Sequence, residues 1–482
     1  MREYKKLVGQ TLIYGLGTII PRFLNYLVLT PVYTRLFEPE SYGIITEIYA
    51  YIVVLLILLT YGLETGVFRF AQDYNRDKVF STALCSVLST SFIFVVLVFI
   101  FKDNIAGFIG YEDKAVYVKW FALIVAFDAV TAIYFARLRL QEKALKFSII
   151  KIINVFIIIV GVAFFYFILP EVSPDNVRYN INGRVSVDYV FIINLLASGT
   201  IMIIMFFDTI KIKLHFDFDL LKKILRYSYP LLIAGMAGAL NDTIDRILFK
   251  HLVPVEEAMF LLGIYGANYK LAVVMTLFIQ MYKYAVEPFF FDKMKMNSAK
   301  LYYAEITKFF IIITWIIFLA VILYLDIFKF LIDKDYHAGL KIVPVILLAN
   351  IMLGIFYNLS FWYKVTNLTR YGALITITGA CITILLNIFL IPRFGYIGAA
   401  WTHLACYTCM VLFSYFLSRK FYRVNYDLFN IFIYSLLALG LFFAKSFVVF
   451  YNDVLQYGVY TLIFVLYIGF VFKREKVLKR FF

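Results

Sequence analysis

Predominantly apolar stretches of about 20 residues recur along the whole of this 482-residue chain. A helix rises 1.5 Å per residue, so a run of ~20 apolar residues spans the ~30 Å hydrocarbon core of a bilayer. Strands of a membrane barrel would instead give segments of about 10 residues with alternating polarity, which the chain lacks. The composition agrees, because 63% of the residues are hydrophobic and only 16% are charged. The sequence therefore predicts an all-α polytopic membrane protein.

The chain contains fourteen candidate transmembrane helices. Their approximate limits are 7–36, 40–72, 79–101, 116–136, 145–169, 187–207, 228–250, 260–291, 302–330, 341–363, 370–391, 396–418, 428–449 and 454–472. The opening "MREYKK" resembles the basic region of a signal peptide, but no short apolar region with a small-residue cleavage site follows. We therefore expect the first span to remain as an uncleaved helix.

The positions of lysine and arginine predict the orientation. If the N-terminus is cytoplasmic, the connectors on that side carry 28 Lys and Arg and those on the other side carry 12. Cytoplasmic connectors of membrane proteins carry the excess of these residues, so both termini are predicted to be cytoplasmic. Topology also explains most of the net charge of +15, so nucleic acid is not needed as a partner. The basic tail "KREKVLKRFF" suits anionic lipid headgroups.

An internal repeat divides the chain nearly in half. Tyr42-Gly43, Tyr61 and Glu64 recur after a shift of 223 residues as Tyr265-Gly266, Tyr284 and Glu287. Arg22 recurs as Arg246 at a shift of 224. Each copy holds six spans, an even number, so the two copies are parallel repeats related by an axis along the membrane normal.

The repeat predicts the domain organisation. Residues 1–210 would form an N-terminal lobe, and residues 211–423 a C-terminal lobe preceded by an interfacial helix. Residues 424–482 would add two helices and a basic cytoplasmic tail. Two six-helix lobes of this kind can enclose a central cavity and expose it to either side in turn.

Several charged residues lie inside the predicted spans, where they are costly and usually face protein or water. Arg22 is 16 residues beyond Lys6, about 24 Å along a helix, which is too deep for easy snorkelling. Glu64 lies at similar depth on the next span and could pair with it. Two interpretations stay open: a buried ion pair that fixes helix packing, or arginines that bind an anion through their planar, permanently charged fork. The candidate anion ligands are Arg22, Arg246 and Lys270, and the candidate coupling or ion-pairing acids are Glu64, Asp128, Asp242, Asp245 and Glu287.

Three segments carry a family resemblance: "GQTLIYGLGTIIPRFLNYLVLTPVYTRLFEPESYG", "LRYSYPLLIAGMAGALNDTIDRILF" and "NIFLIPRFGYIGAAWTHLACY". Together they resemble the polysaccharide-transporter branch of the multidrug/oligosaccharidyl-lipid/polysaccharide exporter superfamily. The resemblance implies a flippase of the bacterial cytoplasmic membrane that moves an undecaprenyl-diphosphate-linked oligosaccharide to the outer leaflet by alternating access. It further implies that Arg22 and Arg246 match cationic cavity positions of the family and would hold the diphosphate.

Such a flippase would recognise sugars through amides, hydroxyls and aromatic faces. The candidates are Asn25, Asn241, Asn268, Tyr357 and Asn358. Expected partners are the lipid-linked oligosaccharide, membrane lipids and other polysaccharide-assembly proteins such as a polymerase. No cofactor or nucleic acid is expected. Whether a proton or a sodium ion drives transport is left open.

Two other functions compete with the flippase. A drug or metabolite antiporter of the same superfamily would share the lobes, but its cavity should be acidic to suit organic cations. A membrane polymerase or ligase should carry a large extracytoplasmic loop, and the longest one here, 170–186, is short. A metal site at His403, Cys406 and Cys409 is disfavoured because a fourth ligand is missing. The sequence thus favours a transporter over an enzyme.

Overall fold

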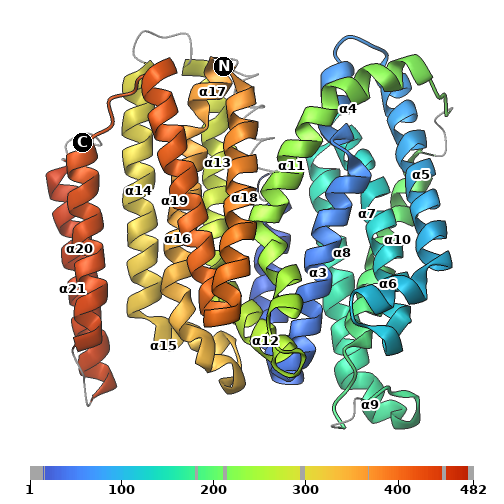
Figure 1. Cartoon of the computed structure of the whole chain (residues 1–482), viewed down its shortest axis with the longest axis horizontal. Helices are drawn as coiled ribbons and strands as arrows, with labels where there is room; N and C mark the ends of the chain where they lie inside the picture. The colour runs from blue at the N-terminus through green and yellow to red at the C-terminus, as the bar shows by residue number, and fades with distance from the viewer. Residues whose placement is uncertain are drawn as a thin grey trace. The chain divides into compact units, whose positions relative to one another are not determined.

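The computed structural model describes residue 15 and residues 17–179, 183–209, 214–293, 299–366, 368–447 and 452–475. Side chains at 285, 287–293, 446 and 447 lie outside this description. The described chain is helical apart from short connectors and an isolated antiparallel bridge between Tyr179 and Val185. This confirms the predicted all-α class (Figure 1).

The chain forms two compact units. Unit 1 consists of Met1–Gly266 with Thr383–Ile388, and unit 2 of Ala267–Ile382 with Phe389–Phe482. The lobe limits predicted from the repeat lie at 210/211 and 423/424, so the predicted N-terminal lobe ends before unit 1 does. Unit 1 extends further because α11 (Phe218–Leu252) packs on α3 (Pro39–Thr60), α4 (Leu63–Phe70) and α5 (Arg76–Ile100).

The remaining helices follow in chain order. Before α3 lie helical residues 17–24, η1 (Asn25–Leu29) and α2 (Thr30–Leu36). Between α5 and α11 lie α6 (Lys102–Phe108), η2 (Glu112–Lys114), α7 (Ala115–Leu140), α8 (Ala144–Ala163), η3 (Phe164–Ile168), α9 (Leu169–Val172), η4 (Pro174–Asn176) and α10 (Asp188–Thr209). After α11 come α12 (Val255–Leu271), α13 (Val273–Lys293), α14 (Ala299–Leu323), α15 (Leu325–Phe328), η5 (Lys329–Leu331), η6 (Lys334–Ile342), α16 (Val343–Leu359), α17 (Phe361–Val365), α18 (Thr369–Phe394), α19 (Tyr396–Phe421), α20 (Leu428–Phe447) and α21 (Asp453–Arg474).

The helices account for the fourteen predicted spans. Among the described residues, 11 helices are long and apolar enough to cross a membrane, and α12 with α13, bent by 48°, makes a twelfth. The thirteenth is α11, whose 35 residues include the polar stretch around Asn241. The fourteenth is the helix that continues from residue 17 to Leu36 through a π-helical turn.

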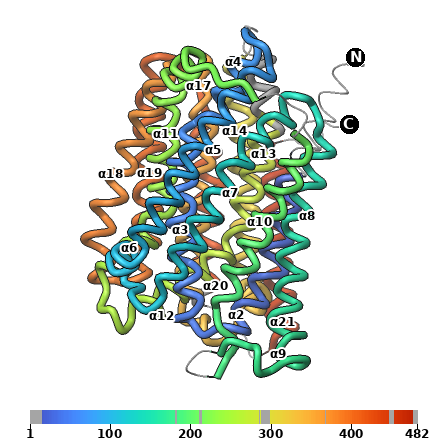
Figure 2. The backbone as a smooth tube through the Cα atoms, turned by 90° about the vertical axis from the view of Figure 1, so that its right-hand side faces the viewer, coloured from blue at the N-terminus to red at the C-terminus, as the bar shows by residue number. Residues whose placement is uncertain are grey.

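Helix α7 forms the centre of unit 1. It packs against α3, α4, α5, α6, α8 and α10, and Figure 2 shows it between α5 and α10. Small or β-branched residues such as Ala122, Val125, Ala129 and Ala136 are fully buried along it. Small side chains let neighbouring helices approach closely in a membrane, where packing rather than hydrophobicity drives association.

Two π-helical turns precede prolines. η1 ends just before Thr30 and Pro31, and η3 ends just before Leu169 and Pro170. Proline removes one backbone donor and its ring crowds the carbonyl four residues earlier, so the preceding turn widens by one residue. Asn25, a predicted sugar ligand, begins the first of these turns and is exposed.

A sharper break separates α3 from α4. Tyr61 (φ 32°) and Gly62 (φ 74°) both adopt left-handed backbone, which ends α3 and restarts the helix at Leu63. Tyr61 lacks the freedom of glycine there, and a 2.6 Å hydrogen bond between its hydroxyl and Ser86 holds it in place. The break places Glu64 in the first turn of α4, where a carboxylate is favoured by the helix dipole.

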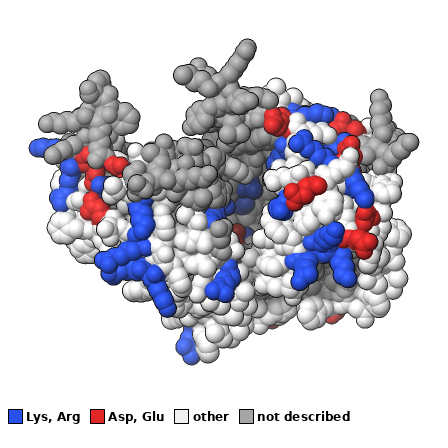
Figure 3. Space-filling view, turned by 90° about the horizontal axis from the view of Figure 1, so that it is seen from above, with Lys and Arg blue, Asp and Glu red and all other residues white. Residues whose placement is uncertain are grey.

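The predicted interfacial helix is continuous with the seventh span. α11 begins at Phe218, runs along one end of unit 1 and bends before it descends, as Figure 1 shows. Pro230 lies inside it and removes one helical hydrogen bond, which permits the bend. Asp217 caps the helix and pairs with Lys78 at 2.6 Å, and these hydrogen bonds lower the pKa of the Asp217 carboxyl. We call this end of unit 1, formed by residues 69–78, 137–146 and 214–226, the basic end. These residues include ten Lys and Arg against five Asp and Glu, and lysines and arginines gather on this end in Figure 3.

The basic end offers a local stability test. Asn75 caps α5 by accepting hydrogen bonds from the backbone N–H groups of Asp77 (3.0 Å) and Lys78 (3.1 Å). We expect Asn75→Ala to lower the free energy of unfolding by about 1 kcal/mol because both donors lose their partner. Asn75→Ser, which keeps an acceptor, should lose less. Thermal unfolding of the detergent-purified variants, followed by circular dichroism, measures this; equal losses for both variants would contradict the capping role.

Unit 2 is built around α16 and α19, which pack along most of their length. The indole of Trp362 donates to Ser414 at 3.1 Å, and α20 and α21 pack on α14. Lys308 of α14 bonds Glu475 at 2.6 Å and Asp427 at 3.2 Å. Burial alone would raise the pKa of Asp427, but hydrogen bonds from Asn430 and Lys308 hold it below its usual value. This ion-pair network fastens the last two helices to α14.

Candidate functional site

Charged side chains from three other helical segments lie around Lys151 of α8. Lys151 interacts electrostatically with the acids Asp128 and Glu64 and with the cations Arg22 and Arg139. Its ammonium lies 4.0 Å from the centre of the Phe135 ring. We call Arg22, Glu64, Asp128, Arg139 and Lys151 the Lys151 cluster. Three cations against two acids leave it net positive when all are charged, so it can attract an anion.

Arg22 reaches this cluster because its helix packs closely on α8. A side chain at Gly17 would place its Cβ 1.9 Å from the hydroxyl of Ser148, so only glycine permits the approach. The side chain of Arg22 is exposed. A guanidinium exposed inside an apolar helix bundle is costly against lipid and is expected to face water or a polar ligand.

Glu64 forms an ion pair with Arg139 of α7. The pair is 3.0 Å long, and both side chains are partly accessible, at 40% for Glu64 and 38% for Arg139. The sequence suggested Arg22 as a possible partner of Glu64, whereas in the structure Glu64 forms its ion pair with Arg139. Sequence reasoning assigned Arg139 to a connector because basic residues cluster there, but α7 stays helical through Leu140 and carries Arg139 back to α4.

Asp128 lies deeper on α7. Its carboxylate interacts electrostatically with the hydroxyl of Ser198 on α10 and with the ammonium of Lys151. The predicted coupling acid therefore belongs to the Lys151 cluster.

The predicted polar stretch of α11 divides between its faces. Asp245 is fully buried and Asn241 is 3% exposed, with its carbonyl oxygen accepting from Thr383 at 3.3 Å. Asp242 is exposed. Arg246 is half-buried and interacts electrostatically with Tyr42 of α3, one of the residues that mark the repeat.

The predicted ligands in unit 2 have structural partners. The amide of Asn268 donates to the carbonyl of Tyr336 at 2.7 Å. Asn358 accepts from Tyr282 and donates to the Gly354 carbonyl at 3.0 Å. Both amides are buried, so they fix helix packing.

Tyr357 and Lys270 are more accessible. Tyr357 is half-buried, and the ammonium of Lys283 lies 4.8 Å from its ring centre. Lys270 is exposed at the end of α12. Glu287 lies in α13, but its side chain falls outside the described residues.

Sequence reasoning missed a buried acid at the other end of unit 1. Glu47 of α3 is 0% exposed, and its Oε2 accepts a 2.6 Å hydrogen bond from the Tyr111 hydroxyl. Lys250 of α11 lies 3.7 Å from the same oxygen. The available signal was a charge eight residues into the second span, in "ESYGIITEIY". We call Glu47, Tyr111 and Lys250 the Glu47 cluster.

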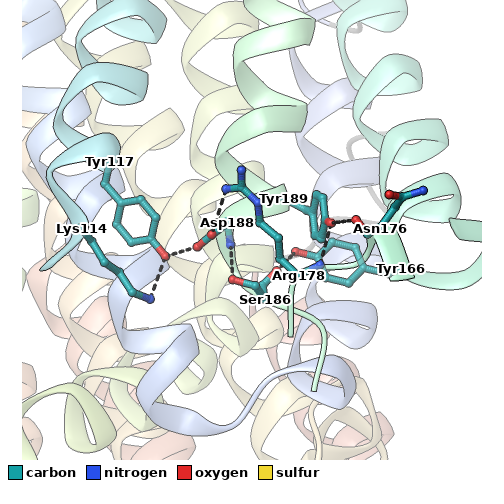
Figure 4. A network of polar contacts seen from close by, with 8 residues as sticks. All are labelled: Lys114, Tyr117, Tyr166, Asn176, Arg178, Ser186, Asp188 and Tyr189. Carbon is teal, nitrogen blue, oxygen red and sulfur yellow. Dashed lines mark hydrogen bonds and ion pairs between the residues drawn. The ribbon is translucent and has the colours of Figure 1, made fainter. Parts of the chain in front are cut away.

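A polar network beside it holds the connector between η3 and α10 (Figure 4). Asp188 accepts from Tyr117, and Lys114 donates to the same Tyr117 hydroxyl at 3.1 Å. The Tyr166 hydroxyl donates to the carbonyl of Ser186 at 3.0 Å, and the backbone N–H of Arg178 donates to the Tyr189 hydroxyl at 2.9 Å. These bonds fix the described connector residues 173–179 and 183–188. We call them, together with the connectors at 37–39, 109–114 and 252–255, the opposite end of unit 1.

The sulfur and imidazole groups of α19 have other partners. His403 packs against Tyr269 and Tyr407, with ring centres 6.0 and 5.8 Å away, and the thiol of Cys406 donates to the Gly379 carbonyl at 3.4 Å. Within the described parts of the chain, no three His, Cys, Asp or Glu side chains are grouped to hold a metal ion.

Comparison with known proteins identifies the family of this chain and proteins of the same fold. The sequence profile of the family described as "Polysaccharide biosynthesis protein" matches residues 7–294. A search of curated proteins found no significant match.

Solved structures share the fold. The lipid II flippase MurJ in an inward closed conformation superimposes with a TM-score of 0.73 at 15% identity, covering 96% of this chain and 99% of that one. An inward-facing multidrug resistance MATE family transporter of the MOP superfamily gives 0.65 at 11% identity over 82% and 94% of the two chains. Its outward-facing counterpart gives 0.60 at 11% identity over 86% and 95%. The family profile covers more than half of the sequence, so the chain belongs to the polysaccharide biosynthesis protein family and shares the fold of the MOP superfamily.

Proposed function

We propose that this protein is a flippase that moves an undecaprenyl-diphosphate-linked oligosaccharide across the bacterial cytoplasmic membrane for O-antigen, capsule or exopolysaccharide synthesis. The observation that carries the proposal is the Lys151 cluster, which places an exposed arginine, a second arginine and a lysine inside the helices of unit 1. Family membership supports a saccharide substrate, and the shared fold supports a transporter rather than an enzyme.

The cluster suits a diphosphate. Arginine offers paired N–H donors that match phosphate oxygens and remains charged at every physiological pH. Arg22 would meet the diphosphate first, and Arg139 would exchange the carboxylate of Glu64 for a phosphate oxygen. Because that ion pair is partly accessible, breaking it costs little compared with a buried pair. Within unit 1, Arg246 would add a further cation for the substrate, and Asn25 remains an accessible candidate for sugar contact. Lys270 and Tyr357 remain the accessible candidates of unit 2.

The orientation follows from charge. The basic end of unit 1 would face the cytoplasm, where lipid-linked sugars are assembled, and both termini would lie on that side. Asp128, which is half-buried, and Asp245, which is fully buried, are acids that could carry a coupling ion. A polymerase would take the product on the other side.

The competing function is a cation-coupled drug or metabolite antiporter, which the similarity to multidrug transporters favours. The net positive Lys151 cluster argues against it, because organic cations would be repelled.

Transport by the purified protein distinguishes the two functions. Proteoliposomes would contain an undecaprenyl-diphosphate-linked oligosaccharide with a fluorescent sugar, and a membrane-impermeant quencher would report which leaflet holds it. We expect flipping well above that of protein-free vesicles, and no accumulation of ethidium under a proton or sodium gradient. Ethidium transport without flipping would establish the antiporter instead. In cells, loss of the gene should leave lipid-linked repeat units on the inner leaflet.

A further inference from the structure

At the opposite end of unit 1, α3 and α12 touch backbone to backbone. A side chain at Gly263 would place its Cβ 1.8 Å from the carbonyl oxygen of Pro39, and one at Gly43 would lie 2.1 Å from that of Met259. Distances this short leave room only for hydrogen, so the two helices cross at these glycines. Helix α11 also packs along α3. The beginning of the second repeat copy is therefore held against the first copy here.

The Glu47 cluster lies beside this crossing. Lys250 donates to the carbonyls of Ile109 (2.7 Å) and Gly110 (3.1 Å), and its ammonium lies 3.6 Å from the centre of the Tyr111 ring. The Tyr111 hydroxyl also contacts the sulfur of Met259 at 3.8 Å. Glu47 thereby connects α3 to α11, to the connector at 109–111 and to α12. The same acid that neutralises Lys250 also ties these elements together.

Glu47 is incompletely satisfied as an ion. Its Oε2 accepts from Tyr111 and faces Lys250, but its Oε1 is buried and has no hydrogen-bond partner among the described residues. The titratable groups that face it are Tyr111 from the connector, Lys250 from α11 and Tyr51 from its own helix. Burial, and next the Glu47 charge, raises the pKa of the Tyr111 hydroxyl, so this phenol stays protonated and donates. The remaining proton-accepting position is on the carboxylate itself.

The cluster is close to the surface. Gly110 is exposed, and the Lys250 side chain is 12% exposed. A proton from that side has to pass only the connector at 109–111 to reach the carboxylate. Glu47 is thus buried but within reach of the aqueous phase on one side.

We propose that Glu47 is the acid that couples proton uptake to opening of the opposite end. The charged carboxylate of Glu47 holds Lys250 and keeps the α3–α12 crossing closed. Protonation of the carboxylate releases Lys250 and lets the crossing open. The inference rests on the proposed function as a transporter that exposes its path to each side in turn. Protonation removes the attraction that offsets the burial of the Lys250 ammonium, and a buried cation without its counter-ion is strongly unfavourable. Separation of α3 from α11 and α12 lets water reach Lys250 and relieves that cost.

Distance measurement between the two helices tests the latch directly. Spin labels at Glu40→Cys in α3 and Glu257→Cys in α12, both exposed at this end, would report the separation in proteoliposomes after replacement of the four native cysteines. For the otherwise unaltered protein, we expect the long-distance population to grow as the pH on this side falls. With Glu47→Gln, the ratio of open to closed should rise by at least about tenfold at neutral pH and lose its pH dependence.

A second variant gives a result that simple destabilisation would not give. Lys250→Met leaves the charged carboxylate of Glu47 as the buried ion without a counter-ion, so the pH dependence should reverse, and the closed population should grow as the pH on this side falls. The matched control is Glu38→Gln, an acid at the start of α3 that pairs with the exposed Arg184 at 3.4 Å and should leave the distances unchanged.

Two outcomes would overturn the proposal: a pH-dependent distance that persists unchanged in Glu47→Gln, or an unaltered protein with no pH-dependent distance change. The measurement uses no lipid-linked substrate. A flippase assay that fails while the distances respond as expected would therefore refute the proposed function and leave the latch standing.

Discussion

Replacing Arg22 and Arg246 together by alanine should lower the rate of lipid-linked oligosaccharide flipping by at least about a hundredfold. A hydrogen bond to a charged group contributes about 1.5–3 kcal/mol, so the loss of two arginines removes about 3–6 kcal/mol of substrate binding. The effect should appear in the proteoliposome assay and, in cells, as lipid-linked repeat units retained on the inner leaflet.

The matched control for this double variant is Arg69→Ala. Arg69 also lies on a predicted span, but its ion pair with Asp73 is exposed, with side-chain accessibilities of 48% and 54%. The Arg69→Ala variant should flip the lipid-linked oligosaccharide at the same rate as the unaltered protein. Replacement of Arg22 and Arg246 by lysine keeps the charge without the planar fork and should restore only part of the rate. Unchanged flipping in the alanine double variant, with normal insertion, would leave these arginines a purely structural role.

Lys308→Met should destabilise the protein by about 3–5 kcal/mol, because it leaves a buried carboxylate without its cation. The side chains of Lys308 and Glu475 are only 13% and 5% exposed, and Glu475 also accepts a 2.7 Å hydrogen bond from Tyr434. The loss should be measured as the free energy of unfolding in denaturant in mixed micelles. It should be accompanied by release of α20 and α21, detected as new protease cleavage between α19 and α20.

Removing the charge of Glu475 as well should recover much of the free energy of unfolding that Lys308→Met loses. In Lys308→Met/Glu475→Gln no buried charge remains, so the double variant should be more stable than Lys308→Met alone. Lys329→Met, which breaks the more exposed pair with Asp326, should cost under about 1 kcal/mol. A Lys308→Met protein as stable as this control would show that packing alone holds the last two helices.

The sequence predicted the helices better than it predicted the partners of their charged residues. Run length and hydropathy located the 11 described helices, or 12 with the bent pair α12 and α13, that are long and apolar enough to cross a membrane, because a bilayer imposes one length on every crossing. They could not show that α11 continues through Pro230 into its span, since proline more often ends a helix than bends one. The repeat markers Tyr42-Gly43 and Tyr265-Gly266 proved to lie on α3 and α12, the helices that cross at their glycines.

The partners of single charges depend on helix ends and on rotation about helix axes. Glu64 was placed at a plausible depth, but its partner Arg139 could be found only once the break at Tyr61 and Gly62 set the direction of α4. Glu47 was passed over because one acid inside an apolar run has no recognisable motif, and its importance comes from Lys250, about 200 residues away in the sequence.

The central position of α7 has a mechanical consequence for the Lys151 cluster. Asp128 and Arg139 lie on the helix that packs against six other helices of unit 1, so a shift of the backbone at either residue moves α7 against all six. A ligand that binds Arg139 therefore acts on a tightly packed helix. We expect any resulting movement to occur where other helices of unit 1 are irregular. The regular helix is interrupted at the π-helical turn η1 and at Pro230 in α11, which lie on the segments that carry Arg22 and Arg246, so we expect movement at these two places.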